Sequence, residues 1–205
     1  MAKKSTRDRL LQAACEVFAK KGFADTTVAE ICAEAGANIA SVNYYFGGKE
    51  ALYDAVWHRA FELAEAFVPL EGDLPENASL EDYLFQLAHS VLSRTFCEGE
   101  GGLFSKLLYR EMASPTLALE RISQEVFEPQ MQRLREAILL AYPEAPEMKV
   151  LSCVHSIIAQ CAFYNFSRPL RDRILAFSNF SANEIEGLAR HIARFSVGGI
   201  REALQ

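Results

Sequence analysis

The chain has 205 residues, half of them apolar, and a net charge of −6 at neutral pH. Its five cysteines form an odd set without a C-x-x-C pair, which argues against a disulfide framework and a zinc site and fits a reducing cytoplasm. The acidic balance counts against a nucleic-acid partner, but the first 50 residues hold seven basic and six acidic side chains, a net of +1 that leaves −7 for the rest.

Apolar residues recur along most of the chain at helical spacing, and no series of alternating strands with hairpin turns appears. We therefore predict an all-α chain with about nine helices. The basic N-terminus lacks a long apolar stretch, so we expect neither a signal peptide nor a membrane anchor. The breaks between helices are predicted at Gly22, Gly36, Gly47–Gly48, 68–79, 97–102, Ser114–Pro115, 141–147 and Arg168–Pro169.

The first predicted helix carries an apolar stripe and ends at Gly22, after two lysines that suit the negative end of a helix. The stripe consists of Leu10, Ala14, Val17 and Phe18. Thr27 and Glu30 then form a capping-box pattern, which predicts the start of a second, short helix that ends at Gly36.

After a tight turn, Asn38 is predicted to cap a third short helix, which ends before Gly47–Gly48. Its inward side chains are expected to be Ile39, Val42, Tyr45 and Phe46, which would anchor a helix too short to be stable alone. Its outward side chains are expected to be Ala40, Ser41, Asn43 and Tyr44. Two short helices joined in this way form a helix-turn-helix pattern, which is typical of DNA-binding proteins.

The outward side chains of the third helix suit the major groove of DNA. Ser41 and Asn43 can hydrogen-bond base edges, and Ala40 can touch a thymine methyl group. Tyr44 can reach a phosphate, and Lys49 opens a fourth helix whose first amides and positive pole favour a phosphate. A plain helical corner over residues 26–50 would show the same spacing, so the residues alone leave both interpretations open.

The stretch "TTVAEICAEAGANIASVNYYFGGKEALYDAV" closely resembles the DNA-binding segment of TetR-family transcription regulators, and the likeness covers about residues 6–56. It has a capping threonine, an alanine-glycine turn, an aromatic end and a Lys-Glu helix start. Gly48 stands where the family often has a serine cap.

The resemblance implies a sequence-specific DNA-binding regulator in two parts. Residues 1–48 would form a three-helix, helix-turn-helix DNA-binding domain, and residues 49–205 a helical ligand-binding and dimerisation domain. The DNA-binding residues expected on this basis are Thr27, Asn38, Ala40, Ser41, Asn43, Tyr44 and Lys49.

Three later segments, "LLYREMASPTLAL", "QCAFYNFSRP" and "HIARFSVGGI", resemble the C-terminal domain of CecR-like (YbiH-like) members. This resemblance implies a homodimer, paired through its last two helices, that binds a near-palindromic DNA operator and a small-molecule effector. The last helix has Ile185, Leu188, Ala189, Ile192 and Ser196 on one stripe, and Gly198–Gly199 near its end. We expect a repressor that an apolar or aromatic ligand releases from its operator.

Three helices carry apolar stripes that are candidates for the ligand cavity. The candidate residues are Phe104, Leu108, Met112, Phe127, Met131, Gln160 and Tyr164, of which Gln160 and Tyr164 could orient a ligand. Plain core is the alternative interpretation of such stripes. No cofactor is expected, and a metal site is disfavoured because Cys153, His155 and Cys161 do not share one helix face.

Two prolines predict local features, and one apolar run predicts a buried helix. Ser114–Pro115 predicts a cap and the first residue of a new helix, whereas Pro129 predicts a kink near Phe127. Residues 150–167 have no formal charge with His155 neutral, but their polar side chains disqualify a membrane span and predict a buried helix.

Other classes of protein explain the pattern less well. An enzyme is disfavoured because no phosphate loop, nucleophile-base pair or cofactor fingerprint appears. A helical protein-interaction adaptor would explain the C-terminal helices but not residues 38–49. A constitutive or activating regulator without a ligand stays open as an alternative to the ligand-released repressor.

Overall fold

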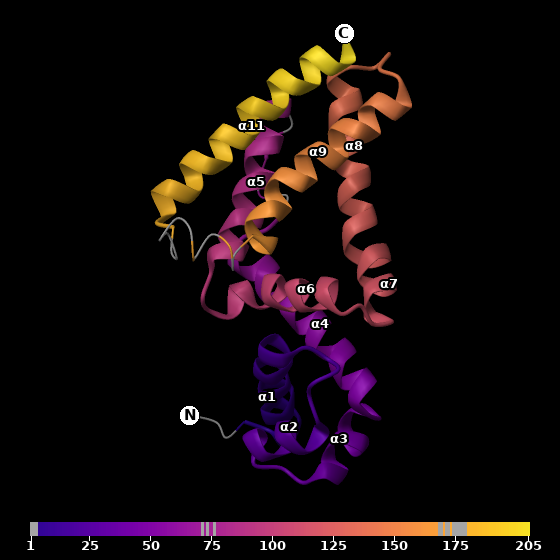
Figure 1. Ribbon diagram of the computed structural model, residues 1–205, viewed down its shortest axis with the longest axis vertical. Helices are drawn as coiled ribbons and strands as arrows, with labels where there is room; N and C mark the ends of the chain where they lie inside the picture. The colour runs from indigo at the N-terminus through magenta and orange to yellow at the C-terminus, as the bar shows by residue number, and fades with distance from the viewer. Residues whose placement is uncertain are drawn as a thin grey trace. The chain divides into compact units, whose positions relative to one another are not determined.

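The computed structural model describes residues 4–167 and 180–205 except positions 71, 73 and 76, together with residues 170 and 173. These residues form nine helices and no strand, as predicted, if α7, a π-helical turn and α8 are counted as one continuous helix (Figure 1). The predicted break at Arg168–Pro169 lies outside the described residues. The helices are α1 (Thr6–Lys21), α2 (Val28–Ala35), α3 (Ile39–Phe46), α4 (Lys49–Phe67), α5 (Leu80–Phe96), α6 (Leu103–Ala113), α7 (Ala118–Ile122), α8 (Glu128–Ala141), α9 (Glu147–Phe166) and α11 (Ala182–Leu204).

The helices pack as two compact units, each made of two segments of chain. The first unit contains α1–α4 with residues Glu98–Leu119, and the second contains Val68–Cys97 with Glu120–Gln205. Packing thus places α4 and α6 with the N-terminal helices. The boundary predicted between residues 48 and 49 concerns function rather than packing, and it stays a prediction.

An aromatic core holds the first unit together. The predicted stripe of α1 is buried at Leu10, Ala14 and Phe18, and Val17 is half-buried. Phe18 packs on Tyr53 of α4 with 4.7 Å between the ring centroids, and Phe23 packs on the same ring at 5.0 Å. Because these contacts join α1 to α4, the two helices support the shorter α2 and α3 between them.

The second unit is built on α5, α9 and α11, with α11 lying along α5 (Figure 1). In α11 the predicted stripe is buried at Ile185, Ala189, Ile192 and Ser196, and Leu188 is half-buried. In α9 only one face is buried, as at Cys153 and Ile157, so the prediction of a buried helix is half right. None of the helices in the described part of the chain is long and apolar enough to cross a membrane.

The two prolines act differently from one another. Before Pro129 the helix widens into a π-helical turn, Ser123–Phe127, in which the Glu128 amide bonds to the Ser123 carbonyl. Proline cannot donate the usual bond to the carbonyl four residues earlier, and the helix is locally π-helical just before it, whereas the kink predicted near Phe127 stays a prediction. The helix predicted to start at Ser114–Pro115 instead starts at Ala118, because the Thr116 hydroxyl accepts the Ala118 amide.

We predict that Gly101→Ala destabilises the protein. A Cβ at residue 101 would lie 2.5 Å from Cγ and 2.8 Å from Cβ of Phe67, so α4 or the turn must move at a cost of about 1–3 kcal/mol. Gly187→Ala is the control, because nothing lies within 4 Å of that site and a helical alanine should gain up to about 1 kcal/mol. Urea denaturation measures both changes, and an unchanged midpoint for Gly101→Ala would contradict this packing.

Candidate nucleic-acid interface

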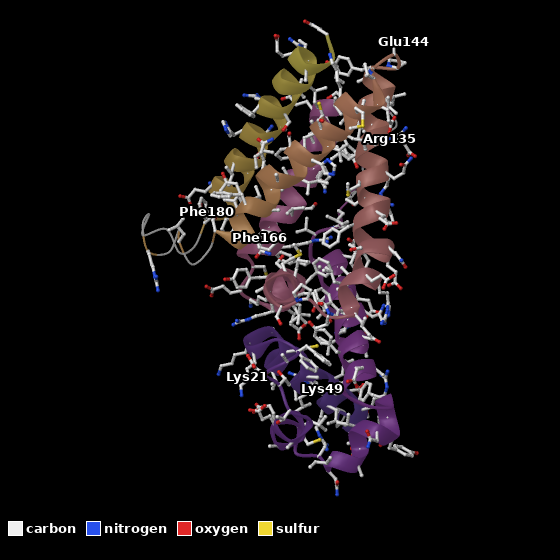
Figure 2. All side chains as sticks on the ribbon, turned by 45° about the vertical axis from the view of Figure 1, so that its right-hand side comes forward. Lys21, Lys49, Arg135, Glu144, Phe166 and Phe180 are labelled. Atoms are coloured by element: carbon white, nitrogen blue, oxygen red, sulfur yellow. The ribbon has the colours of Figure 1, made fainter. Side chains whose placement is uncertain are left out.

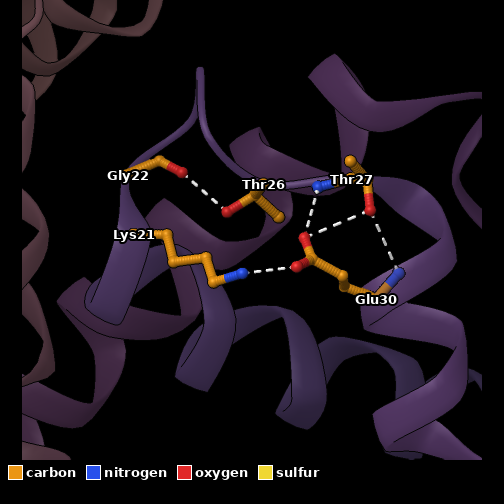
Figure 3. A network of polar contacts seen from close by, with 5 residues as sticks. All are labelled: Lys21, Gly22, Thr26, Thr27 and Glu30. Atoms are coloured by element: carbon orange, nitrogen blue, oxygen red, sulfur yellow. Dashed lines mark hydrogen bonds and ion pairs between the residues drawn. The ribbon is translucent and has the colours of Figure 1, made fainter.

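A polar network closes the turn between α1 and α2 (Figure 3). The Thr27 hydroxyl accepts the Glu30 amide at 3.2 Å, and the Glu30 carboxylate accepts the Thr27 amide at 3.0 Å, which confirms the predicted capping box. Lys21 forms an ion pair with Glu30, and the Thr26 hydroxyl donates to the Gly22 carbonyl at 2.7 Å. Thr27 is therefore exposed but held in place at the start of α2.

The third helix is capped at both ends by the residues that the sequence indicates. Asn38 accepts the Ala40 amide at 3.0 Å through its side-chain oxygen. Gly47 ends the helix in the left-handed conformation, and Gly48 follows at φ 146°, a value that side chains rarely adopt. A serine at residue 48 would be strained in this backbone conformation. The glycine therefore allows the turn between α3 and α4, although it provides no side-chain cap.

The burial of α3 differs from the prediction. Val42 is fully buried, and Phe46 is half-buried beneath the Arg7 guanidinium, which lies 5.2 Å from its ring centroid. Ile39 and Tyr45 were expected to face inward, yet they are 56% and 40% exposed. They lie about 60° to either side of Val42 around the helix, and the neighbouring helices cover only the stripe between them.

The expected DNA-binding residues gather on the first unit. Asn38, Ala40, Asn43 and Tyr44 are exposed, whereas Ser41 is half-buried. Tyr44 is 82% exposed, and its ring meets the ring of Tyr45 edge-on at 4.8 Å. Ile39, which was expected to face inward, is exposed beside them at the start of α3.

Lys49 has a partner that the sequence did not indicate. Its ammonium lies 4.2 Å from the centroid of the Phe23 ring, a cation–π contact between the start of α4 and the turn after α1. Figure 2 shows Lys49 and Lys21 on the same group of helices. Both lysines are thus held by groups of the first unit.

The seven expected ligand-binding residues are divided between the units. Phe104, Leu108 and Met112 belong to the first, and Phe127, Met131, Gln160 and Tyr164 belong to the second. Phe104 is buried against Trp57 and Phe61, with ring centroids 5.4 and 6.1 Å away, whereas Met112 is 49% exposed.

The polar members of this set already have partners within the second unit. The Gln160 amide donates to the Ser196 hydroxyl at 3.1 Å, which joins α9 to α11, and the Tyr164 ring packs on Phe96. A groove of about 930 Å³ in the first unit runs along α1, α4 and residues 98–106, and none of the seven residues lines it. In the described residues no group of three His, Cys, Asp or Glu side chains could hold a metal ion.

Comparison with known proteins identifies the fold and the family. Residues 10–56 match the model of bacterial regulatory proteins of the tetR family, and residues 80–200 match the C-terminal domain of the HTH-type transcriptional dual regulator CecR. The chain belongs to the TetR family of transcriptional regulators. This assignment agrees with the resemblance of both halves of the sequence.

Individual relatives and structures support the same assignment. CecR of Shigella flexneri is 26% identical over 79% of this chain and 76% of that protein, and the repressor NicS of Pseudomonas putida is 31% identical over 83% and 81%. Bacillus subtilis FadR, solved with stearoyl-CoA, superposes with a TM-score of 0.69 at 16% identity over 94% of this chain and 98% of that one. At that identity the likeness concerns the fold alone.

The capping box predicts an unusually acidic carboxyl group. The hydrogen bond from Lys21, followed by those from Thr27, lowers the pKa of Glu30 from 4.5 to about 2. A folded-state pKa below the unfolded value stabilises the fold above about pH 4.5, and this contribution is lost as the pH falls toward 2. NMR titration of the Glu30 carboxyl should show a higher pKa in Lys21→Ala and no change in Lys20→Ala. Equal pKa values in the two variants would contradict the role of Lys21.

Proposed function

We propose that this TetR-family regulator is a cytoplasmic homodimer that represses transcription at a near-palindromic operator until a small apolar or aromatic effector releases it. The observation that carries the proposal is the surface of α3. Of its eight residues only Val42 is fully buried, so the helix presents most of its side chains to a partner. Two copies of α3 would enter successive major grooves, about 34–36 Å apart or a multiple of that.

The chemistry of this surface supports a division of labour. Ser41 and Asn43 would hydrogen-bond base edges, and Ala40 would contact a thymine methyl group. Thr27, Asn38, Tyr44 and Lys49 would meet phosphates and set the register of the helix in the groove. Ile39 adds to this scheme, because an exposed branched side chain at the N-terminal end of α3 matches another thymine methyl group.

The second unit would supply the dimer contact. On α9 and α11, the last two helices described, Phe163 and Phe195 are 60% and 65% exposed. Nothing lies within 4 Å of the sites where Gly198 and Gly199 would carry a Cβ, so another helix could approach closely there. Two such faces would form a four-helix bundle across the symmetry axis.

The effector would bind beside those expected residues that lie in the second unit, Phe127, Met131, Gln160 and Tyr164. Since Gln160 already bonds to Ser196, a ligand that took this amide would also loosen α9 from α11. A coupling of about 1–3 kcal/mol between effector and operator would change operator affinity 5- to 150-fold. One protein of similar fold, Bacillus subtilis FadR, was solved with stearoyl-CoA, a ligand that has a long apolar part.

A mobility-shift selection on genomic fragments, followed by footprinting, tests the proposal. We expect a dimer that protects a near-palindrome, and the region upstream of the protein's own gene is the first fragment to examine. Absence of any specific fragment would favour a helical adaptor. Compounds that raise the melting temperature are then added to the complex, and a specific complex that no compound releases would favour the constitutive regulator.

Lys49→Ala tests the phosphate contacts. Each phosphate contact that is lost should reduce the slope of log K against log salt by about 0.9, or nearly twice that per dimer, with little change in sequence preference. Titrating operator at several salt concentrations gives the slope. An unchanged slope would mean that, in the wild-type complex with DNA, the Lys49 ammonium stays on the Phe23 ring and contacts no phosphate.

Ile39→Ala tests the proposed reading of thymine. In the wild type, replacing the contacted thymine by deoxyuridine removes one methyl group and should weaken binding about fourfold, the equivalent of about 0.8 kcal/mol. In Ile39→Ala the same replacement should cost nothing, because the apolar partner is already gone. Scanning each thymine of the footprinted operator with both proteins measures this difference. An equal cost in the two proteins at every position would exclude Ile39 as a base-reading residue.

A further inference from the structure

The last turn of helix α6 carries two consecutive charged residues, Arg110 and Glu111, of the segment "LLYREMASPT". The Arg110 guanidinium donates to the Lys20 carbonyl at 2.6 Å. This carbonyl belongs to the last turn of α1, where carbonyls lack partners within the helix. Arg110 therefore caps the end of α1 from another helix.

Glu111 is the most buried acidic residue among those that the structure describes, with 1% exposure. One carboxylate oxygen accepts the Tyr53 hydroxyl of α4 at 2.8 Å. The other accepts the amide and the hydroxyl of Thr116 at 2.6 and 2.7 Å. Burial and the Glu111 carboxylate raise the pKa of Tyr53 well above its usual range, so the phenol keeps its proton and remains a donor. Three donors compensate the cost of burying the carboxylate, and they fix α4 against the end of α6.

Glu111 and Arg110 each bond to a residue that is linked, through its neighbours, to a residue expected to contact DNA. The ring of Tyr53 packs on the Phe23 ring, and the ammonium of Lys49 lies over that same Phe23 ring. On the other side, Lys20 is followed by Lys21, which pairs with Glu30 in the capping box of Thr27 (Figure 3).

We propose that Arg110 and Glu111 are positioning residues for DNA binding, which hold the ends of α1 and α4 so that Thr27 and Lys49 reach the phosphates together. On this view α6 is a structural part of the DNA-binding unit, and it sets operator affinity even without an effector. The inference rests on the proposed function, because it assumes an operator that Thr27 and Lys49 contact.

Arg110→Gln tests the inference, with Lys106→Gln as the matched control. Both residues lie on α6 and donate to a backbone carbonyl, but Lys106 bonds to the Glu98 carbonyl at 2.9 Å and not to a carbonyl of α1. On the footprinted fragment Arg110→Gln should bind about 3- to 10-fold more weakly, with a smaller salt slope, whereas Lys106→Gln should bind like the wild type. Wild-type affinity and slope in Arg110→Gln would overturn the inference.

Tyr53→Phe removes the hydrogen bond from Tyr53 to Glu111 with minimal change of shape, and so tests the role of Glu111. It should also weaken operator binding and reduce the salt slope at a temperature where the variant is fully folded. A lower melting temperature with unchanged operator affinity and slope would mean that the network serves stability alone, which overturns its positioning role. Failure of the wild type to bind any fragment would instead contradict the proposed function.

Discussion

The first unit depends on a constraint of length, because an eight-residue helix such as α3 is not stable by itself in water. Forming the first turn of a helix is costly, and few later residues repay that cost in so short an element. The chain therefore supports α3 from outside, with Asn38 and Gly47 at its ends and with Val42 and Phe46 beneath it. This arrangement leaves the rest of the helix surface exposed.

The side chains that hold α3 in place depend in turn on the longer helices α1 and α4. α1 and α4 share an aromatic core around Tyr53, and that residue is hydrogen-bonded to the buried carboxylate of Glu111. A buried carboxylate tolerates little movement of its donors, because each lost hydrogen bond leaves charge uncompensated. The order of the surface on α3 thus depends on contacts between residues that are 58 positions apart in the sequence.

The sequence predicted what short-range chemistry decides. The capping box at Thr27 and the cap at Asn38 each involve residues within about one turn, so their patterns are visible in the chain. Burial of Ile39 and Tyr45 was predicted wrongly because helical spacing gives the direction of a side chain but not the width of the surface that covers it. The hydrogen bonds between Tyr53 and Glu111 and between Gln160 and Ser196 join distant segments, and no local sequence pattern predicts them.

The charges of the first unit explain how an acidic protein can still present an ordered surface to a polyanion. Lys21 is paired with Glu30, and Lys49 lies on the Phe23 ring, so each cation is held in place by a partner within the unit. In the proposed complex, a phosphate that takes Lys49 would have to compete with the Phe23 ring, which would lower the net gain from that contact. On the proposed function, binding would then depend less on general attraction to the DNA backbone and more on the neutral side chains of α3. Such a balance would favour discrimination between DNA sequences over affinity for DNA in general.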